Sequence, residues 1–272
     1  MEKMLLFFEN MPTWQKLAWV ISCIGVAWIA EGVYPLISHS YKKWKHAKIN
    51  LIFLSTTLVI NVLFGVLTVG VFNWTQINEF GLLFLFDLPL WANLLIALMV
   101  FDLVAQYFVH FLLHKVSFMW RFHMVHHSDT EVDVTSGTRH HPGDYIMREV
   151  FSLLAALIVG APLSFYLLYR IITVFFTYST HANITVPTWV DKTIGLVFIT
   201  PNMHKFHHHF ERPWTDSNYG NIFSIWDRMF GTLVIGDPKK VKYGLDVLDD
   251  KNSGDVLYQF KVPFDKKIKT DY

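Results

Sequence analysis

Long stretches without charged residues constrain this chain more than any other feature of its sequence. Residues 49–78 form thirty consecutive positions with no formal charge. A helix that crosses the hydrocarbon core of a bilayer needs about 20 predominantly apolar residues. Two further stretches, between Lys16 and Lys42 and over residues 88–114, each contain one acid, Glu31 and Asp102 respectively. The sequence therefore predicts three membrane spans in these regions.

A fourth apolar region, residues 150–190, is broken near its middle by Gly160, Ala161 and Pro162. Proline removes a backbone donor, and the residue before it is displaced from the helical conformation. We therefore expect two helices, at about residues 150–160 and 163–180, that form a hairpin entering the bilayer and returning. The predicted fold is an all-α, multi-pass membrane bundle with about four membrane-inserted segments, one of them a hairpin, and a cytoplasmic histidine-rich helical cap.

The distribution of lysines sets the expected orientation. Residues 41–48 carry four lysines, whereas residues 73–89 carry only two acids. Because cytoplasmic loops are enriched in lysine and arginine, we expect residues 41–48 in the cytoplasm. Two spans and then the hairpin return the chain to that side. We expect three regions: an N-terminal transmembrane region (1–97), a histidine-rich domain (98–235) and a charged cytoplasmic tail or cap (236–272).

Composition excludes several classes of protein. The chain is 53% hydrophobic and 17% charged, unlike a typical soluble domain. Its net charge of +1 argues against a nucleic-acid partner, which needs a basic face. The single Cys23 excludes an intramolecular disulfide framework and a cysteine-built metal site. Acids near the N-terminus and the lack of a small-residue cleavage pattern argue against a signal peptide.

Histidine is the second unusual feature, because twelve of the fourteen histidines lie between residues 110 and 209. His110 and His114 end the third apolar stretch, and residues four apart share one face of a helix. Such a pair alone could equally be two interfacial histidines. Phe111 stands where the zinc-peptidase HExxH motif has its glutamate, so that motif is absent.

Two later segments share a denser pattern. WRFHMVHHSD contains His123, His126 and His127, and PNMHKFHHHFE repeats the same spacing with His204, His207 and His208. Adjacent residues on a helix point about 100° apart, so neighbouring histidines suit two different metals. A protonated surface cluster or a metal-storage tract is the alternative. Storage tracts, however, are typically runs of histidine in flexible polar loops.

These segments carry a resemblance to the fatty acid hydroxylase and sterol desaturase superfamily of membrane non-haem di-iron oxygenases, over about residues 98–235. Further matching segments are RHHP (139–142), THAN (180–183), NYG (218–220) and WDRMFGT (226–232). The closing segment is similar to the alkylglycerol monooxygenase and bacterial sterol-desaturase-like branch. Phe111 departs from the arginine that often follows the first histidine of the first box.

The resemblance implies a set of metal ligands, with nine histidines for two irons and His141 as a possible tenth. The set is His110, His114, His123, His126, His127, His141, His181, His204, His207 and His208. His140 and His209 are expected outside it. An all-histidine site needs nearby acids to balance its charge, and the candidates are Asp102, Asp129, Asp133, Asp144, Asp216 and Asp227. We expect Asp102 and Asp227 beside the ligands; for Asp102, pairing with Arg121 or another helix is the alternative.

The resemblance also implies the chemistry, which is the use of dioxygen and a di-iron site to hydroxylate or desaturate a C–H bond of a membrane lipid. The sequence has no GxGxxG fingerprint, so we expect an external electron donor, either a redox protein or a reduced pterin. The ending KKIKTDY has no KKxx or KDEL-type signal, which favours a bacterial inner membrane over the endoplasmic reticulum. Two other functions stay open: a histidine-rich membrane protein that transports metal or protons, and a zinc-dependent membrane hydrolase.

Overall fold

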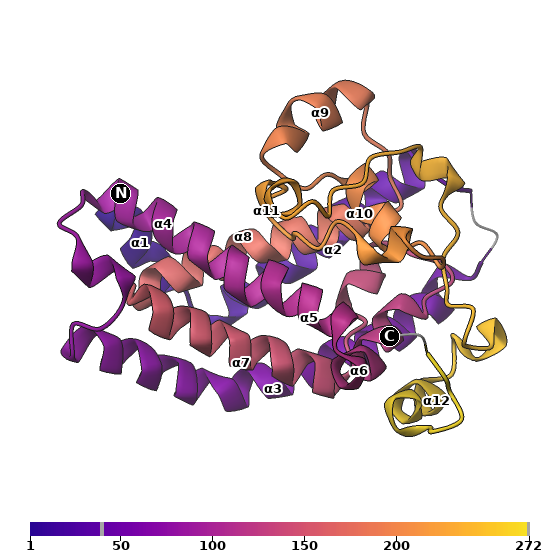
Figure 1. The fold of residues 1–272 in the computed structure, drawn as a ribbon, viewed down its shortest axis with the longest axis horizontal. Helices are drawn as coiled ribbons and strands as arrows, with labels where there is room; N and C mark the ends of the chain where they lie inside the picture. The colour runs from indigo at the N-terminus through magenta and orange to yellow at the C-terminus, as the bar shows by residue number, and fades with distance from the viewer. Residues whose placement is uncertain (39–40, 271–272) are drawn as a thin grey trace.

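The computed structural model describes residues 1–38 and 41–270, so His39 and the last two residues of the expected tail lie outside the described chain. Within the described residues the secondary structure is helical, and the only extended pairings are two isolated bridges, Pro35–Ile184 and Phe198–Phe223. The predicted all-α class is confirmed. Long helices run side by side along the longest axis, and shorter helices and loops cover one end (Figure 1).

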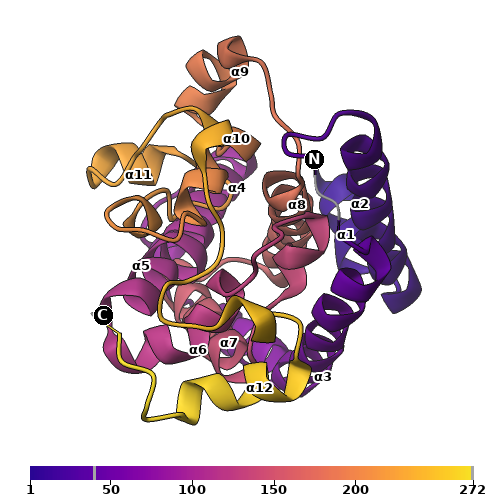
Figure 2. The same ribbon diagram turned by 90° about the vertical axis from the view of Figure 1, so that its right-hand side faces the viewer.

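The long helices form the body of the molecule. Their bounds are α2, Thr13–Val33; α3, Lys43–Ile77; α4, Leu90–Asp102; a π-helix, Leu103–Phe108; α5, Val109–Lys115; α7, Pro142–Val159; and α8, Leu163–His181. A short helix, α1 (Glu2–Glu9), packs on α8 at the far end of the body, and a 3₁₀ turn, Leu82–Leu85, precedes α4. Helix α3 packs mainly on α7, and α2 packs mainly on α8 (Figure 2).

Three helical segments of the described chain are long and apolar enough to cross a membrane: Thr13–Val33, Lys43–Leu85 and Leu90–Lys115. They coincide with the three spans that the uncharged stretches predict. Their outer faces expose large apolar side chains, with Ile21 69%, Val62 76% and Val66 79% exposed. Such surfaces suit contact with lipid acyl chains rather than with water.

The two helices of the predicted hairpin are present as α7 and α8, although neither is among the segments of the described chain that are long and apolar enough to cross a membrane. Helix α7 begins eight residues earlier than expected, because Pro142 stands at its first turn, where no N–H is needed, and the Nδ1 atom of His141 accepts a hydrogen bond from the Gly143 amide. Gly160, in the left-handed region at φ 65°, ends the helix. A Cβ atom there would lie 2.3 Å from the Phe80 carbonyl oxygen, so the turn packs against the α3–α4 connection at the far end.

The centre of the body is a cluster of aromatic rings and small residues. Phe72 and Phe101 are fully buried with Tyr169, and the Phe101 and Tyr169 ring centroids lie 5.3 Å apart. Ala155 and Ala156 on α7 are also fully buried. Small side chains at a helix interface allow close approach of the backbones, which is how membrane helices commonly associate.

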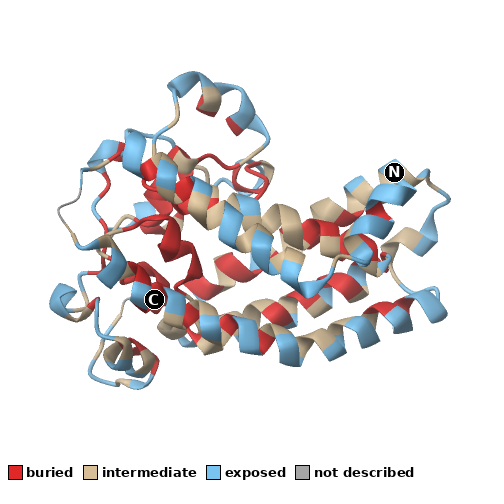
Figure 3. Cartoon of the chain, turned by 180° about the vertical axis from the view of Figure 1, so that it is seen from behind, coloured by how far each residue is buried: buried red, intermediate tan, exposed pale blue. Residues whose placement is uncertain are grey.

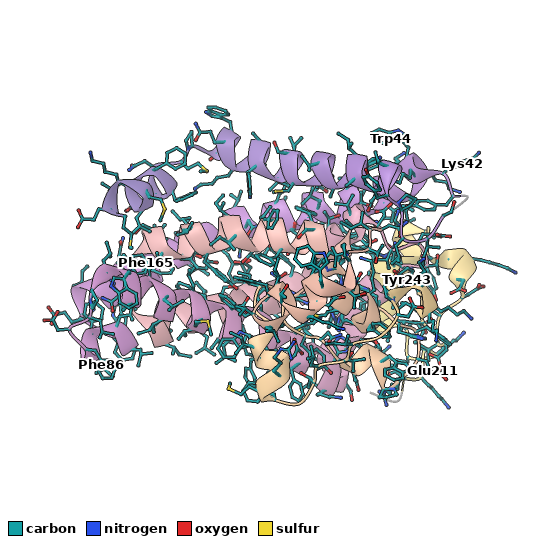
Figure 4. All side chains as sticks on the ribbon, turned by 90° about the horizontal axis from the view of Figure 1, so that it is seen from above. Lys42, Trp44, Phe86, Phe165, Glu211 and Tyr243 are labelled. Carbon is teal, nitrogen blue, oxygen red and sulfur yellow. The ribbon has the colours of Figure 1, made fainter. Side chains whose placement is uncertain are left out.

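Short elements build the histidine-rich end, which we call the cap. They are α6, Ser117–His127; a 3₁₀ turn, Val134–Thr138; α9, Thr188–Lys192; a 3₁₀ turn, Ile194–Leu196; α10, Pro201–His207; a 3₁₀ turn, Trp214–Asp216; α11, Ile225–Met229; 3₁₀ turns Pro238–Lys240 and Asp250–Asn252; α12, Val256–Lys261; and a 3₁₀ turn, Val262–Phe264. Buried residues concentrate at this end (Figure 3). Figure 4 shows Phe86 and Phe165 at the opposite end from Lys42, Glu211 and Tyr243.

The charged C-terminal segment is a packed part of the cap rather than a free tail. The guanidinium of Arg121 on α6 donates to the carbonyls of Pro263, Asp265 and Ile268. The Ser128 hydroxyl donates to Gln259 at 2.9 Å. The segment predicted to be a charged tail is therefore packed against α6 and Ser128 over about residues 259–268.

Candidate metal centre

Nine buried histidines meet at the cap end of the body in two adjacent groups. The first group is His110, His114, His123, His127 and His207, and the second is His126, His181, His204 and His208. Within each group, one nitrogen from every ring lies within 4.8 Å of the corresponding nitrogens of the others. They come from the ends of α5, α6, α8 and α10, which helix packing brings together.

Adjacent histidines fall into different groups. On α6, His127 belongs to the first group and His126 to the second, and at the end of α10 His207 and His208 divide in the same way. The ring planes of each pair are nearly perpendicular, at 87° and 88°. The helical offset between neighbouring side chains thus places one histidine of each pair in each group.

Distances between the ring nitrogens suit metal ligands. The His110 and His123 Nε2 atoms are 3.1 Å apart, and the His204 and His181 Nε2 atoms are also 3.1 Å apart. Two nitrogens bound at about 2.1 Å to one metal stand roughly 3.0 to 3.4 Å apart in octahedral or tetrahedral geometry. Two unprotonated nitrogens cannot hydrogen-bond to each other, and the buried His207 Nε2 has no hydrogen-bond partner within the described chain. The groups therefore fit metal ions.

The second nitrogen of several rings meets a fixed acceptor. His110 Nδ1 lies 2.9 Å from the Tyr219 carbonyl oxygen, and His207 Nδ1 lies 2.8 Å from that of Ser217. His181 Nδ1 lies 2.7 Å from the Thr177 carbonyl oxygen. Metal-binding histidines typically donate their other N–H in this way, which fixes the tautomer and the ring orientation.

Burial keeps the imidazoles in the form that binds metal. It lowers the pKa of His123 to about 4 despite the nearby Asp144, and burial together with His123 lowers the pKa of His207 to about 3. Burial and repulsion between neighbouring imidazoles hold other histidine pKa values well below their usual range, at His126, His127, His204 and His208. These rings are neutral at neutral pH, as metal coordination requires.

The two acids expected beside the histidines lie one step further out. Asp102 accepts from the Ile222 and Phe223 amides and from the Trp226 indole on α11. Of the alternative partners, Arg121 or another helix, the structure therefore has the other helix. Asp227 accepts from the Tyr219 amide at 2.8 Å, and burial raises the pKa of Asp227 to about 6. Both acids hold the loop whose Tyr219 carbonyl meets His110, and in the structure neither touches a histidine of the groups.

Two other acids do make that contact. The Asp144 carboxylate lies 3.5 Å from His123 Nδ1, and Asp216 lies 3.4 Å from His114 Nδ1. Both belong to the six acids that the sequence offered to balance the charge of the site, and the tertiary packing brings these two next to the histidines. Asp129 and Asp133 instead contact His46, at 2.8 and 3.0 Å, in a buried network next to the cap.

The other histidines of the described chain lie outside the two groups. The structure does not bring His141 to them, because its Nδ1 caps α7 and its Nε2 lies 3.4 Å from the Phe260 carbonyl oxygen. His140 stacks on His126 with centroids 4.7 Å apart. His209 lies beyond the second group, with its Nδ1 accepting from the Glu211 amide.

Two features of the site had no clear signal in the sequence. One is the π-helix between Asp102 and His110, a rare form that appears often at functional sites. The other is Arg139, whose carbonyl lies 3.3 Å from His126 Nδ1. Its fully buried guanidinium donates to Asn50 and Ser128 and to the Ser253 carbonyl. A contact through a backbone carbonyl does not depend on the residue type, so the sequence could not predict it, although the RHHP motif drew attention to this segment.

The cluster of buried, neutral histidines at one end of an apolar helical body defines a class, a membrane-type metalloprotein with a polyhistidine centre. Comparison with known families agrees. The sequence model of the fatty acid hydroxylase family matches residues 94–232, just over half of the chain. The chain belongs to this family.

Curated relatives carry several substrate names. The ornithine lipid hydroxylase OlsE of Rhizobium tropici is 30% identical over 161 residues, which cover 59% of this chain and 47% of that protein. An alkylglycerol monooxygenase of Caenorhabditis elegans is 29% identical, with coverages of 61% and 33%. A cholesterol 25-hydroxylase-like protein of Danio rerio is 28% identical, with coverages of 52% and 55%. The chain thus spans about half or less of the length of most of these relatives, and no solved structure matches significantly.

Proposed function

We propose that this chain is an integral-membrane di-iron oxidoreductase that uses dioxygen to hydroxylate a C–H bond of a lipid. The observation that carries the proposal is the pair of adjacent all-histidine groups at the end of a lipid-exposed helical body. Each of the three relatives named above is a hydroxylase or monooxygenase, or is named as similar to one, and their names favour hydroxylation over desaturation.

Five histidines would hold one iron and four the other. Imidazole binds several transition metals, so the ligand type alone does not select among them, and iron enters through the family. When bound, the iron pair supplies the activation of dioxygen. The Tyr219 and Ser217 carbonyls keep two rings turned so that Nε2 points to the centre. Asp144 and Asp216 provide negative charge next to the first group.

The body of the protein brings the lipid to the metals. The candidate spans expose apolar side chains to the bilayer, while the histidines meet where these helices end. A lipid can therefore reach the centre from the membrane, and the packed cap covers the other side and restricts water. We further propose that this end faces the cytoplasm, on the lysines of residues 41–48.

Electrons must come from outside the chain. Reduction of dioxygen during hydroxylation needs two electrons beyond those taken from the C–H bond, and the sequence has no nicotinamide or flavin fingerprint. The donor is a redox protein or a reduced pterin, which would approach the cap.

The experiment that tests this function measures metal and oxygen together. The full chain, purified from iron-replete cells in detergent, should contain close to two irons. It should consume dioxygen only when a lipid and a reductant are both present. Protein without bound iron would refute the proposal, and zinc in its place with lipid hydrolysis would favour the hydrolase. Ion flux through vesicles that His126→Ala abolishes would favour a transporter.

A further inference from the structure

A cavity with both polar and apolar walls lies inside the helical body, next to the histidine groups. Its volume is about 170 Å³, and α2, α3, the π-helix, α7 and α8 all contribute to its wall. The wall is apolar at Val20, Leu54 and Leu58, and polar where α7 and α8 face each other. Polar and ionisable groups are costly among membrane helices, and they mark functional sites there.

One end of the cavity reaches the second histidine group. His140 lines the cavity and stacks on His126, with ring planes 12° apart. Gly137 also lines it, and a Cβ atom at that position would lie 3.3 Å from the His181 ring. A molecule in the cavity is therefore one side chain away from two of the proposed iron ligands.

The other end is a ring of charged and hydroxyl groups centred on Arg170. Its guanidinium donates to Glu149 at 2.7 Å, to Asn61 at 3.0 Å and to the Tyr145 hydroxyl at 3.0 Å. Arg170 lies seven residues before Thr177, which lines the same cavity near the histidines. At 1.5 Å per residue, the two ends are about 10 Å apart along α8.

The charges of this ring balance. Arg170 pairs with Glu149, and Arg148 pairs with Asp144 through its Nε atom at 3.1 Å. The structure gives the second oxygen of Glu149 and the Nη atoms of Arg148 no hydrogen bond to the described residues. Arg170, Arg148 and Glu149 all line the cavity. A buried anion would add an uncompensated charge here, whereas a hydroxyl can both donate to a carboxylate and accept from a guanidinium.

We propose that this cavity selects a neutral lipid bearing a hydroxyl group, held at Glu149 and Arg170 about 10 Å from the histidine groups. The inference rests on the proposed function, because it names the substrate class of the same centre. The ring thereby fixes which C–H bond lies next to the metals. Free fatty acids and phosphate esters are excluded by charge, and plain hydrocarbons leave the second oxygen of Glu149 without a hydrogen-bond partner.

The dimensions of the cavity agree with this use. Typical small-molecule sites enclose about 300–1,000 Å³, so about 170 Å³ takes only the polar part of a lipid and a short length of chain. The rest of the lipid chain must extend out of the cavity. Helix α2 packs on α8 and α3 packs on α7, and the exposed Leu58 lies on the wall, which leaves a way out towards the bilayer.

The test compares three probes of equal chain length: hexadecan-1-ol, hexadecane and hexadecanoate. The iron-loaded full chain is placed in nanodiscs, and each probe is titrated by mole fraction while stabilisation against thermal unfolding is followed. We expect hexadecan-1-ol to reach half of its effect at a mole fraction about tenfold lower than the other two, as hydrogen bonds to charged groups predict. Glu149→Gln and Arg170→Met should each reduce this preference at least threefold at unchanged iron content.

Glu79→Gln is the matched control, because Glu79 is an exposed acid in the far connection, and it should keep the full preference. Equal binding of the three probes, tighter binding of hexadecanoate, or an undiminished preference in both variants would overturn the inference. If either variant fails to fold, the other and the wild-type comparison still decide. Because binding is read without turnover, a failure of the proposed oxygen chemistry is seen separately, as missing iron or missing oxygen consumption.

Discussion

The two histidine groups lie side by side, yet they are held by different parts of the molecule. The first group is oriented by cap carbonyls, at Ser217 and Tyr219, and by two carboxylates, Asp144 and Asp216. The second group has only backbone acceptors of this kind in the described chain, from Thr177 on its own helix and from Arg139. The cavity reaches the second group through His140 and Gly137, and it reaches the first group through Arg148, which pairs with Asp144.

This difference indicates that the two histidine groups have different roles within one centre. Carboxylate partners increase the basicity of a ligating imidazole and compensate the charge of a bound cation. The first group is therefore built for tight metal binding. The second faces the space where a lipid would enter and has fewer fixed charges. Substitutions that change one histidine group and leave the other intact test this difference.

The largest effect is expected from removing one ligand of either group. His207→Ala and His208→Ala delete neighbouring residues that belong to different groups. Each should lower the iron content from two towards one per chain and reduce lipid-dependent oxygen consumption by more than about 100-fold, beyond the range of changes around ligands. The control is His209→Ala, since this adjacent ring lies outside both groups. Equal losses of iron and of oxygen consumption in all three variants would mean that His207 and His208 do not differ from His209 in metal binding, which would contradict the two groups.

A large loss of stability is expected from Arg139→Met. The guanidinium is fully buried and satisfies acceptors on α3, on α6 and in the C-terminal segment, which the variant would leave unpaired. Each such acceptor costs about 1–3 kcal/mol, so the free energy of unfolding should fall by about 3 kcal/mol. Denaturant titration in detergent measures it. Arg228→Met is the comparison, because Arg228 donates one hydrogen bond, to Gly195. A similar fall in the free energy of unfolding for both variants would mean that Arg139 stabilises the protein no more than Arg228 does.

A smaller effect is expected from Asp144→Asn, mainly on the first group. The carboxylate lies 3.5 Å from His123, and it reaches the second group only through His140, 2.8 Å away, which stacks on His126. The amide keeps the shape but removes the charge beside His123. Loss of such a partner costs about 10–100-fold in metal affinity. Competition with a chelator should release one iron early and the second at the wild-type concentration. Simultaneous release of both irons would mean that the two groups do not differ in this respect.

The smallest effect is expected from Asp227→Asn, which acts through the Tyr219 backbone rather than on a histidine. The carboxylate accepts from two backbone amides and the Thr232 hydroxyl, and an amide oxygen can accept part of these. We expect iron affinity to fall by less than about tenfold, below the range for direct partners. The same chelator competition compares it with Asp144→Asn. A larger loss of iron affinity for Asp227→Asn than for Asp144→Asn would contradict this prediction.

Much of this architecture could be predicted from local patterns. The three spans follow from the length of the uncharged stretches, and the hairpin follows from Gly160 and Pro162. Placement of adjacent histidines in different groups follows from the helical offset. The expected contacts of Asp102 and Asp227 were not found, because their partners are loop amides more than 100 residues and about eight residues away, respectively. Sequence spacing does not report which acid a folded loop brings to an imidazole.

The sequence by itself determined where the helices run and which histidines can share a helical face, since both depend on local periodicity and on the length needed to cross a bilayer. The tertiary structure alone decided that His141 caps α7 while His181 joins the second group. It also placed Asp144 and Asp216 next to rings and opened a charge-balanced cavity below them. Such contacts join residues far apart in the chain, and only the packing of whole helices and loops fixes their distances.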